Sequence, residues 1–482
     1  MDSPPLRPPS QEPWEDEDFR FKTIGTACEW AEAYHPGGYH PVKLGDVINN
    51  RYRVVINNRY RVVRKLGWGQ FSTVWLVVDT QLDRYVSLKI TVARTEDRGG
   101  KEVFFYRSYL SGGCAYIVRL HDAFTIAGPN GKHDALALEV MGPNLSELLR
   151  KRPEFQVGEP WERRFTTAFA KRVLLDTLKA LDFLHERDVV HGDLHFGNIL
   201  TCIGQLKVSP ETESKLQQSI GEGQPLERKD GKKDLWAPSY LLEPRPLDEN
   251  FSYEIEPLVK LADLGGAFSS KVPITGTDAV TPVALRAPEA ILGDVVGKGL
   301  DIWCFGCLIF EMLVGRPIFV GLQSLEGKAY DEITNDEHLC QIWDVVGPFP
   351  QSLREKWRRA DKYFGPDGEK LQPQNEGEDS PDEGQDEDIE DRGNGASPGA
   401  EFDEKMSDTS SVSLAYPGEY SSLERQLTDE KPDDIKEAEE EEMLHLLRWI
   451  FQYNPSHRPS TAKLLDHPWF SRSRGNGSDD KQ

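Results

Sequence analysis

The sequence has 482 residues, and 81 Asp and Glu against 57 Lys and Arg give it a net charge of −24. Six cysteines without paired spacing favour a reducing compartment and argue against a disulfide framework. The sequence contains no apolar signal core and no run of eighteen apolar residues, so we expect no membrane span and a location in the cytoplasm, the nucleus or both.

Residues 1–36 are rich in proline and acidic side chains, and they predict a flexible N-terminal segment. Next comes a tandem repeat, in which residues 47–54 recur as 55–62. Only the second copy runs directly into the glycine-rich segment that follows. The repeat therefore offers two candidate first strands in two registers, and the sequence leaves open whether the duplication is genuine.

Apolar runs at 60–63 and 74–78 predict two strands joined by a tight turn. Glycines in such a turn let backbone N–H groups approach phosphate oxygens, although the pattern alone also fits an ordinary hairpin. Ser72 replaces the third glycine of the usual G-x-G-x-x-G. The candidate phosphate loop consists of Leu66, Gly67, Trp68, Gly69, Gln70, Phe71, Ser72, Thr73 and Val74.

Lys89 lies inside an apolar strand at 86–90, where an unpaired charge would be costly. Nucleotide phosphates and Glu102, in a short predicted helix at 101–106, are the partners that we expect. Glu96 is the competing carboxylate. An edge-strand lysine that points to water is the structural alternative.

The run from His191 to Asn198 places Asp193 five residues before Asn198, between a predicted helix and a strand. Phosphoryl transfer from ATP needs a carboxylate that orients the acceptor hydroxyl and an oxygen ligand for Mg²⁺ nearby. Asp263, at the end of a strand at 259–262, is the second candidate magnesium ligand. Three further motifs follow in order, at 285–289, 301–306 and 457–459.

Together these motifs resemble eukaryotic protein kinases over residues 59–470. The segments 37–46 and 65–76, the Asp-Leu-Gly at 263–265 and a charged insertion at 203–254 are similar to the SR-protein kinase family. The resemblance implies an α+β, two-lobed kinase fold with disordered insertions. Its small β-rich N-lobe would span 37–141 and its mostly helical C-lobe 142–470, with a flexible C-terminus at 471–482.

The C-lobe is expected to be interrupted by two flexible insertions, the spacer at 203–254 and an acidic segment at 367–442. The acidic segment contains 27 Asp and Glu against 6 Lys and Arg, so it carries −21 of the net charge. Few aromatic residues occur in it, and this composition predicts disorder. It is either a solvated spacer or a polyanion that competes for basic substrates.

The resemblance also implies ATP and Mg²⁺ as cofactors and transfer of the γ-phosphate to protein Ser or Thr, in arginine/serine-rich substrates. Catalytic roles fall to Asp193, His195, Lys89 and Glu102, and metal binding to Asn198 and Asp263. Glu139 and Met141 would offer backbone groups to adenine, with Ser87 and Leu200 on either side of the ring. We expect a monomer that does not bind nucleic acid directly.

Several positions depart from the kinase pattern. Gly192 replaces the arginine that gathers a phosphorylated activation loop, and His195 replaces the lysine beside the γ-phosphate. The segment 281–286 also differs from SR-protein kinases. A pseudokinase scaffold and a small-molecule phosphotransferase are therefore alternatives to an active protein kinase, although the motifs at 287–289 and 457–459 argue against the latter.

Glu337 and Asp344 lie seven residues apart, so a helix would place both on one face. They fall where the family binds arginine side chains of its substrates, and they are the predicted docking residues. Arg316 stands where the family has an acid, and we expect it to oppose binding of basic substrates.

Overall fold

The computed structural model describes residues 19–22, 25, 27–48, 59–93, 100–151, 164–320, 328–371 and 421–471. The chain forms two units, one made of Met1–Ile318 with Glu430–Gln482 and one made of Phe319–Asp429. Within the described residues, no helix combines the length and the apolar character that a membrane crossing requires.

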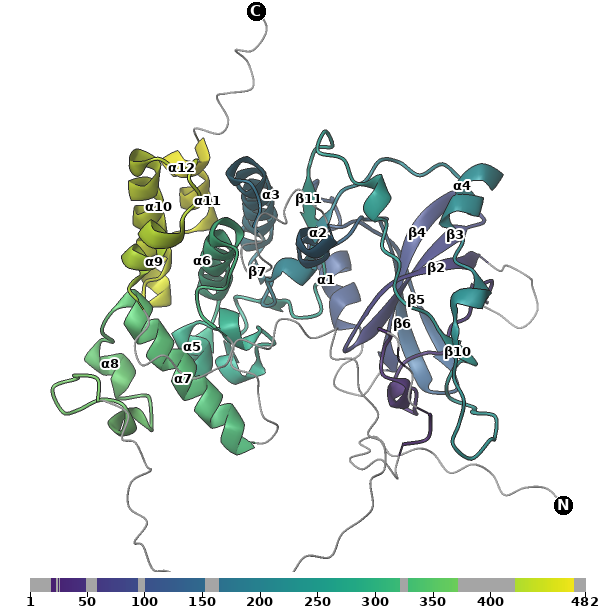
Figure 1. Cartoon of the computed structure of the whole chain (residues 1–482), viewed down its shortest axis with the longest axis horizontal. Helices are drawn as coiled ribbons and strands as arrows, with labels where there is room; N and C mark the ends of the chain where they lie inside the picture. Colours follow the sequence, from purple (N-terminus) through teal and green to yellow (C-terminus); the bar gives the residue numbers. More distant parts are fainter. Residues whose placement is uncertain are drawn as a thin grey trace, which may run out of the picture. The chain divides into compact units, whose positions relative to one another are not determined.

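The N-lobe of the first unit is a six-stranded antiparallel sheet in the order β1-β2-β3-β4-β6-β5 (Figure 1). Successive side chains of the strands face two different cores, because Val62, Trp75 and Val86 lie in one core whereas Val63, Leu76 and Tyr85 lie in the other. Helix α1 (Lys101–Tyr109) carries Glu102. The strands are β1 (Val47–Ile48), β2 (Tyr60–Gly69), β3 (Ser72–Asp79), β4 (Arg84–Ala93), β5 (Leu120–Gly128) and β6 (Gly131–Leu138).

Both copies of the tandem repeat contribute to this sheet. The second copy supplies the start of β2, and the first residues of the first copy form β1. Val47 pairs with Arg61 and Ile48 pairs with Tyr60. Residues 49–58 lie outside the described part of the chain, so the register question is answered only for these two pairs.

The C-lobe is mostly helical, with α3 (Thr167–Glu186) and the apolar α6 (Lys298–Val314) among its long helices. Thr166 caps α3 by accepting a hydrogen bond from the N–H of Phe169, and Gly315 ends α6 in the left-handed conformation that favours glycine. Further helices of the first unit include α2 (Leu145–Lys151), α5 (Pro288–Ile291), α10 (Glu437–Ile450), α11 (Thr461–Leu465) and α12 (Pro468–Ser471).

Short antiparallel strand pairs support the loops of the C-lobe. β8 pairs with β11, β7 with β12, and β13 with β14. Their bounds are β7 (Val189–Val190), β8 (Ile199–Thr201), β11 (Val259–Leu261), β12 (Phe268–Ser269), β13 (Ile274–Thr275) and β14 (Val295–Val296). The two-lobed α+β fold predicted from the sequence is confirmed.

The prediction that the spacer at 203–254 is flexible is wrong. Ser209 caps α4 (Pro210–Leu216), and the spacer also contains the pair β9 (Gln224–Pro225) and β10 (Tyr240–Leu241). Three apolar residues of the spacer, Leu216, Leu242 and Leu247, pack in the two cores of the N-lobe sheet. Leu241 is buried beside Tyr34 and Tyr39, and Phe251 is buried beside Phe169 of α3. Many charged residues separate these side chains, so the sequence pattern did not predict their burial.

Part of the predicted flexible N-terminal segment is also folded. Arg20 forms ion pairs with Glu32 at 2.8 Å and with Asp234 of the spacer at 3.0 Å. Glu29 accepts a hydrogen bond from the hydroxyl of Tyr34 and pairs with the buried Lys65 of β2. Buried charge pairs of this kind tie Arg20, Glu29 and Glu32 to the lobe, whereas residues 1–18, 23, 24 and 26 lie outside the described residues.

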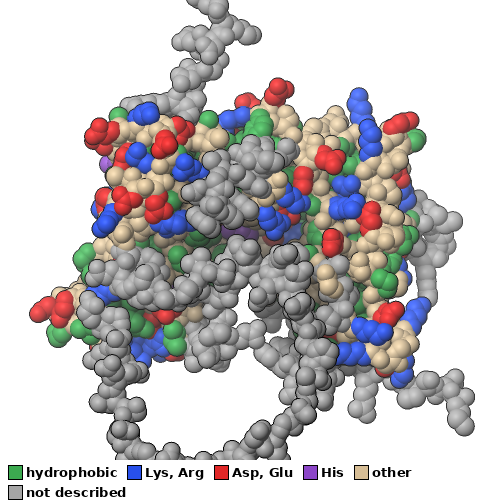
Figure 2. All heavy atoms as spheres, in the orientation of Figure 1, with side chains coloured by type: hydrophobic (Ala, Val, Ile, Leu, Met, Phe, Trp, Pro, Cys, Tyr) green, Lys and Arg blue, Asp and Glu red, His purple; other side chains and the backbone are tan. Residues whose placement is uncertain are grey.

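The acidic segment at 367–442, predicted to be disordered, is in part folded. Its end is helical, since α9 (Leu423–Glu430) buries Leu423 and Leu427, and α10 begins at Glu437. Residues 372–420 and 472–482 lie outside the described residues, so the prediction of disorder there stays a prediction. Figure 2 shows basic and acidic side chains interspersed over the described part of the face that it displays. This distribution is expected, because most of the excess negative charge of the chain lies in the acidic segment.

The second unit contains α7 (Lys328–Val346) and α8 (Gln351–Arg354). Aromatic rings of Trp343, Phe349, Trp357 and Phe364 form its core, with ring centroids 5.6–6.4 Å apart. This core positions the predicted docking helix α7.

Candidate active site

The glycine-rich turn joins β2 to β3 as predicted. Gly69 ends β2 and Ser72 begins β3, so Gln70 and Phe71 form the tip. A side chain at Gly67 or Gly69 would meet no atom within 4 Å, so the backbone there is open to a ligand. The remaining predicted loop residues, Leu66, Trp68, Thr73 and Val74, lie on the two strands.

Lys89 of β4 is buried and binds two carboxylates. Its Nζ lies 2.9 Å from Glu102 and 2.8 Å from Asp263. Since α1 supplies Glu102 and the turn after β11 supplies Asp263, the lysine links three elements. The predicted Lys89–Glu102 pair is therefore present, and the alternative of an edge-strand lysine that points to water is wrong.

Asp263 adopts a left-handed backbone conformation with φ of 62°, which is strained for a residue with a side chain. Its Oδ1 accepts hydrogen bonds from Lys89 and from the N–H of Gly265 at 3.0 Å. Burial acts to raise the pKa of Asp263, but Lys89 outweighs it and the pKa falls to about 2. The carboxylate is thus ionised at neutral pH, with Oδ2 left for a cation.

The catalytic loop runs from β7 through a 3₁₀ turn (Phe196–Asn198) into β8. Asn198 donates from Nδ2 to the carbonyl of Asp193 at 2.9 Å and to its Oδ2 at 3.2 Å. Because both bonds use the amide nitrogen, the Oδ1 of Asn198 remains as an acceptor. Asp301 of α6 holds the start of the loop by accepting from the N–H groups of His191 at 2.8 Å and Gly192 at 2.9 Å.

His195 lies beside the carboxylate of Asp193. Its Nδ1 accepts a hydrogen bond from the N–H of Gly197 at 3.0 Å, which places the ring proton on Nε2. That Nε2 is 3.7 Å from the Oδ2 of Asp193. The ring can therefore donate a hydrogen bond on the side of the loop where Asp193 projects.

The residues predicted to surround adenine lie at the junction of the two lobes. Ser87 of β4 pairs in register with Leu138, the last residue of β6, and Leu200 lies in β8. Glu139 donates its N–H to the carbonyl of Arg119 at 2.9 Å, and its side chain pairs with Lys260 at 2.6 Å. The carbonyl of Glu139 and the backbone of Met141 remain the groups predicted for adenine.

Magnesium fits the oxygen atoms of this site. Mg²⁺ is usually held by one or two carboxylates together with water and substrate phosphates, without a full protein cage. The Oδ1 of Asn198 and the Oδ2 of Asp263 match that donor set, while no group of three or more His, Cys, Asp or Glu in the described residues could hold a metal ion. The chemistry of the donors therefore supports a shared protein and nucleotide site.

Two further residues near the loop escaped sequence reasoning. Thr281 is fully buried and donates to the carbonyl of Gly192 at 2.7 Å. Glu311 of α6 is half-buried, and its partial removal from solvent raises its pKa to about 7 against an opposing effect of His195. Glu311 follows Asp301 by ten residues on α6, and only the three-dimensional fold shows its proximity to His195.

Glu289 forms a buried pair with Arg458, in which the guanidinium donates to both carboxylate oxygens, at 2.5 and 2.8 Å. The pair fixes α5, which follows the segment 281–286, to the C-terminal part of the lobe. This is the link that the motifs at 287–289 and 457–459 predict for a protein kinase.

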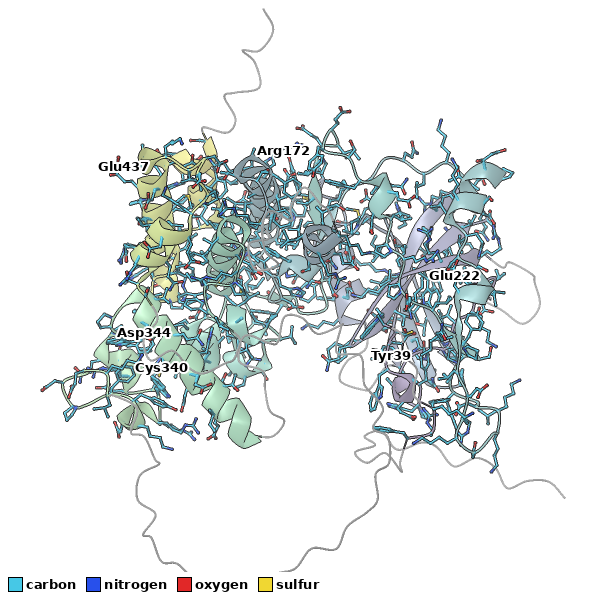
Figure 3. The ribbon with its side chains drawn as sticks, in the orientation of Figure 1. Tyr39, Arg172, Glu222, Cys340, Asp344 and Glu437 are labelled. Atoms are coloured by element: carbon cyan, nitrogen blue, oxygen red, sulfur yellow. The ribbon has the colours of Figure 1, made fainter. Side chains whose placement is uncertain are left out.

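The predicted docking residues Glu337 and Asp344 both lie on α7, but neither side chain is fully exposed. The side chain of Asp344 on α7 (labelled in Figure 3) is 4% exposed, and its Oδ2 lies 2.6 Å from Nζ of Lys370. Glu337 is half-buried, and burial followed by the neighbouring Asp336 raises its pKa. A substrate arginine would have to displace Lys370 to reach Asp344, and the docking role of Glu337 and Asp344 stays a prediction.

Arg316 is not the isolated cation that the sequence suggested. In the first unit its Nε lies 2.7 Å from Oε2 of Glu430, and its Nη2 contacts the other oxygen. The acid comes from α9, more than a hundred residues later, so local sequence gave no sign of it. Its charge is therefore compensated.

Comparison with known proteins agrees with the fold. The protein kinase domain family matches residues 60–210 and 248–470. A crystal structure described as a kinase domain superposes with a TM-score of 0.55 at 21% identity, covering 90% of this chain and 98% of its own, and it supports the fold alone. The two lobes, the loop around Asp193 and the Lys89–Glu102 and Glu289–Arg458 ion pairs together define a protein kinase.

Curated relatives identify a narrower family within the protein kinases. The serine/threonine-protein kinase SRPK of Physarum polycephalum is 31% identical over 373 residues, covering 72% of this chain and 80% of its own length. Protein kinase dsk1 of Schizosaccharomyces pombe is 28% identical, covering 72% and 75%. Human SRSF protein kinase 3 is 37% identical over a shorter stretch, covering 36% and 29%. The chain belongs to the SR-protein kinase family and is a serine/threonine protein kinase.

Proposed function

We propose that this kinase transfers the γ-phosphate of ATP to serine in basic, arginine/serine-rich protein substrates, with Mg²⁺ held by Asn198 and Asp263. The observation that carries the proposal is the convergence of Lys89, Glu102 and Asp263 within 2.9 Å. These contacts hold Lys89 in position to bind nucleotide phosphates. A buried lysine with only a structural role would not require such positioning.

In this proposal Asp193 orients the acceptor hydroxyl and takes its proton, and Asn198 fixes the direction of the Asp193 carboxylate. The Nε2–H of His195 faces the same side and donates to phosphoryl oxygen as charge develops there. Bound Mg²⁺ neutralises charge on the phosphates. Lys89 and the open backbone of the glycine loop hold the phosphates in place.

Substrate basicity is supported by the half-buried Glu311 near His195 and by the acids of α7. An arginine of the substrate would lower the pKa of Glu311, which burial raises to about 7. At α7, Lys370 competes for Asp344, so basic substrates gain affinity only by displacing it. Names of relatives such as SRSF protein kinase 3 point to the same substrate class.

The test is phosphate transfer from radiolabelled ATP to an arginine/serine peptide, an acidic serine peptide and a panel of small amines. We expect transfer to the first and none to the others, with none from an Asp193→Asn variant. Transfer to a small amine alone would overturn the proposal in favour of a small-molecule kinase. ATP binding without transfer to any acceptor would favour a pseudokinase, an alternative that none of the described contacts supports.

Lys370→Ala tests the docking role of α7. Freeing Asp344 should tighten binding of the arginine/serine peptide several-fold, and more so at low salt, because exposed charges are screened over ~8 Å at physiological ionic strength. Lys362→Ala, an exposed neighbour in the same unit, is the matched control. Equal affinities in both variants would remove α7 from substrate recognition.

We further propose that the protein works in the cytoplasm, the nucleus or both, as a monomer. All six cysteines are free thiols, which fits a reducing compartment. Imaging of the tagged chain in cells and light scattering of the purified protein test the two statements.

A further inference from the structure

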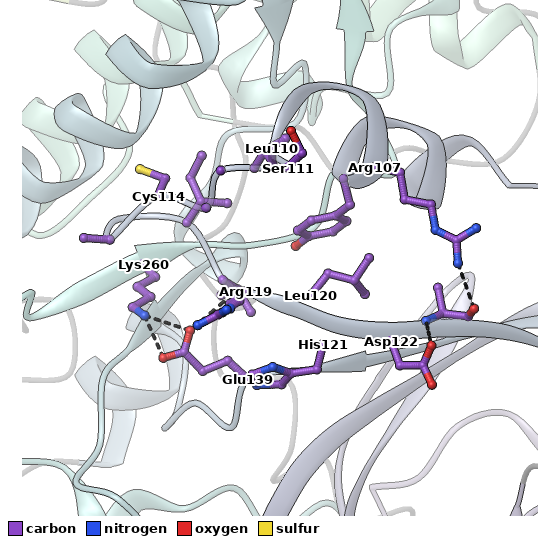
Figure 4. A pocket seen from close by; sticks show the side chains of 17 residues that line it. Arg107, Leu110, Ser111, Cys114, Arg119, Leu120, His121, Asp122, Glu139 and Lys260 are labelled. Atoms are coloured by element: carbon purple, nitrogen blue, oxygen red, sulfur yellow. Dashed lines mark hydrogen bonds and ion pairs between the residues drawn. The ribbon is translucent and has the colours of Figure 1, made fainter.

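A cavity of about 770 Å³ lies in the first unit beside the hinge, the short segment that begins at Glu139, directly after β6 (Figure 4). Its walls come from the end of α1, the loop after it, β5, the hinge residue Glu139 and Lys260 of β11. The volume lies within the usual range for small-molecule sites. Of the residues predicted to bind ATP, only Glu139 borders it, so this is a second cavity and not the nucleotide site.

The acids of this cavity are already paired. Glu139 is held by Lys260 at 2.6 Å and Asp122 by Arg59 at 2.8 Å. Two guanidinium groups in the wall lack such a partner. That of Arg107 donates to the carbonyl of Ala123 at 3.0 Å, and within the described residues neither it nor that of Arg119 contacts a carboxylate. The cavity therefore has an excess of positive charge.

A buried hydroxyl adds a second, independent sign of a ligand. Tyr106 of α1 is 5% exposed and lines the cavity. Its Oη makes no hydrogen bond within the described part of the structure. Buried polar groups nearly always have a partner, so an unpaired hydroxyl at a cavity wall calls for an acceptor from outside the chain.

Apolar side chains complete the wall. Leu110, Ile117, Val118 and Leu120 line the cavity beside the two arginines. A fully polar ligand would leave these side chains uncovered, and a fully apolar one would leave Tyr106 and the guanidinium groups unpaired. The wall therefore matches a molecule with one apolar part and one anionic group.

We propose that this cavity binds a small amphipathic anion, an apolar or aromatic body that carries a carboxylate or phosphate group. Arg119 and Arg107 supply the positive charge, and the hydroxyl of Tyr106 donates to an acceptor of the ligand. Tyr106 follows Glu102 by one helical turn, and Lys260 precedes Asp263 by three residues. The ligand therefore contacts α1 and β11, the elements that position Glu102 and Asp263 beside Lys89.

Cys114 offers a direct reporter, because it lines the cavity and is half-buried. The experiment measures the rate of its alkylation by iodoacetamide in the full chain, read by peptide mass spectrometry. A saturating non-hydrolysable ATP analogue blocks the nucleotide site. Phenyl phosphate and benzoate are the probes, phenol is the neutral comparison, and Cys28, also half-buried but outside the cavity, is the internal control.

We expect one or both anions, but not phenol, to protect Cys114 saturably while Cys28 reacts unchanged. The difference between phenyl phosphate and benzoate identifies the anionic group. Protection should weaken roughly tenfold in Arg119→Gln with Arg107→Gln, since charge-assisted hydrogen bonds to anions are lost. It should also weaken in Tyr106→Phe, but not in Lys132→Gln, which changes an exposed residue outside the cavity.

Absence of protection by either anion, or equal protection in the double arginine variant, would overturn the proposal. If the double variant is unfolded by circular dichroism, Tyr106→Phe decides in its place. Unchanged protection in a folded Tyr106→Phe protein would then count against the site.

Discussion

Thr281 donates its hydroxyl hydrogen bond to the carbonyl oxygen of Gly192 at 2.7 Å. The acceptor belongs to the residue directly before Asp193, so this bond ties the segment before α5 to the backbone of the catalytic loop. Both partners are buried, and a lost donor would leave the carbonyl without its partner.

Thr281→Val removes this donor while keeping the shape of the side chain. The unsatisfied carbonyl should cost about 1–3 kcal/mol, and misplacement of the loop should lower kcat several-fold. Thr281→Ser keeps the hydroxyl and should restore most of the activity. Peptide kinetics and thermal unfolding of both variants check this, and full activity in Thr281→Val would show that the bond is dispensable.

Activity should not depend on phosphorylation of the activation segment. Gly192 offers no arginine for a phosphate, and the buried Thr281 is engaged with the loop. Thr275 and Thr277, whose hydroxyls lie 2.7 Å apart, are exposed and open to modification. Phosphatase treatment should leave the rate unchanged. A large loss that Thr277→Ala reproduces would refute the prediction.

An arginine cannot simply be restored at position 192. Gly192 has φ of +73°, and a Cβ there would lie 2.8 Å from the carbonyl oxygen of Gly266. The left-handed conformation alone costs roughly 1–2 kcal/mol for other residues. Gly192→Ala should therefore lower the unfolding temperature, whereas Gly204→Ala, at a site without close atoms, should not. Equal unfolding temperatures would contradict the strain argument.

His195→Ala should lower kcat by about 10²-fold, the usual loss when a donor to developing charge is removed. His195→Lys should keep or raise the rate, because an ammonium also donates to phosphate. Single-turnover measurements separate chemistry from product release. An unchanged rate in His195→Ala would mean that Nε2 takes no part in transfer.

Glu311 should make stability depend on pH. Its folded pKa of about 7 exceeds the ordinary value of 4.5, so the folded protein binds more protons than the unfolded chain between these values. Stability contributed by the neutral carboxyl is therefore present below pH 4.5 and lost as pH rises through 7. The loss is up to about 3 kcal/mol at 1.4 kcal/mol per pKa unit.

The variant Glu311→Gln cannot ionise at this position. It should be more stable than wild type at pH 8 and similar at pH 5, measured by urea unfolding. A difference that does not change with pH would show that Glu311 is solvated in the folded protein. If the variant is also less selective for arginine beside the target serine, the substrate role of Glu311 gains support.

The sequence predicted the elements that carry short, ordered motifs. The turn between β2 and β3, the partner of Lys89 and the loop around Asp193 all follow from local patterns whose chemistry is specific. Partners that are distant in the sequence could not be foreseen. Glu430 beside Arg316 and Lys370 beside Asp344 depend on how the chain folds back.

The spacer shows a different limit. Its charged composition indicated a flexible segment, yet a few apolar residues, among them Leu216 and Leu242, bury against the sheet. Composition averages over a segment, whereas packing depends on where individual apolar side chains fall. A capped start at Ser209-Pro210 was the one local sign of a helix there.

Asp193→Asn tests the central claim most directly. Asparagine should preserve the shape of the loop but cannot accept the proton of the hydroxyl, so transfer to the arginine/serine peptide should fall by ~10²–10⁴-fold. ATP affinity, measured by calorimetry with Mg²⁺, should remain within a few-fold of wild type. Full turnover in a purified Asp193→Asn protein would contradict the assignment of this loop as the catalytic centre.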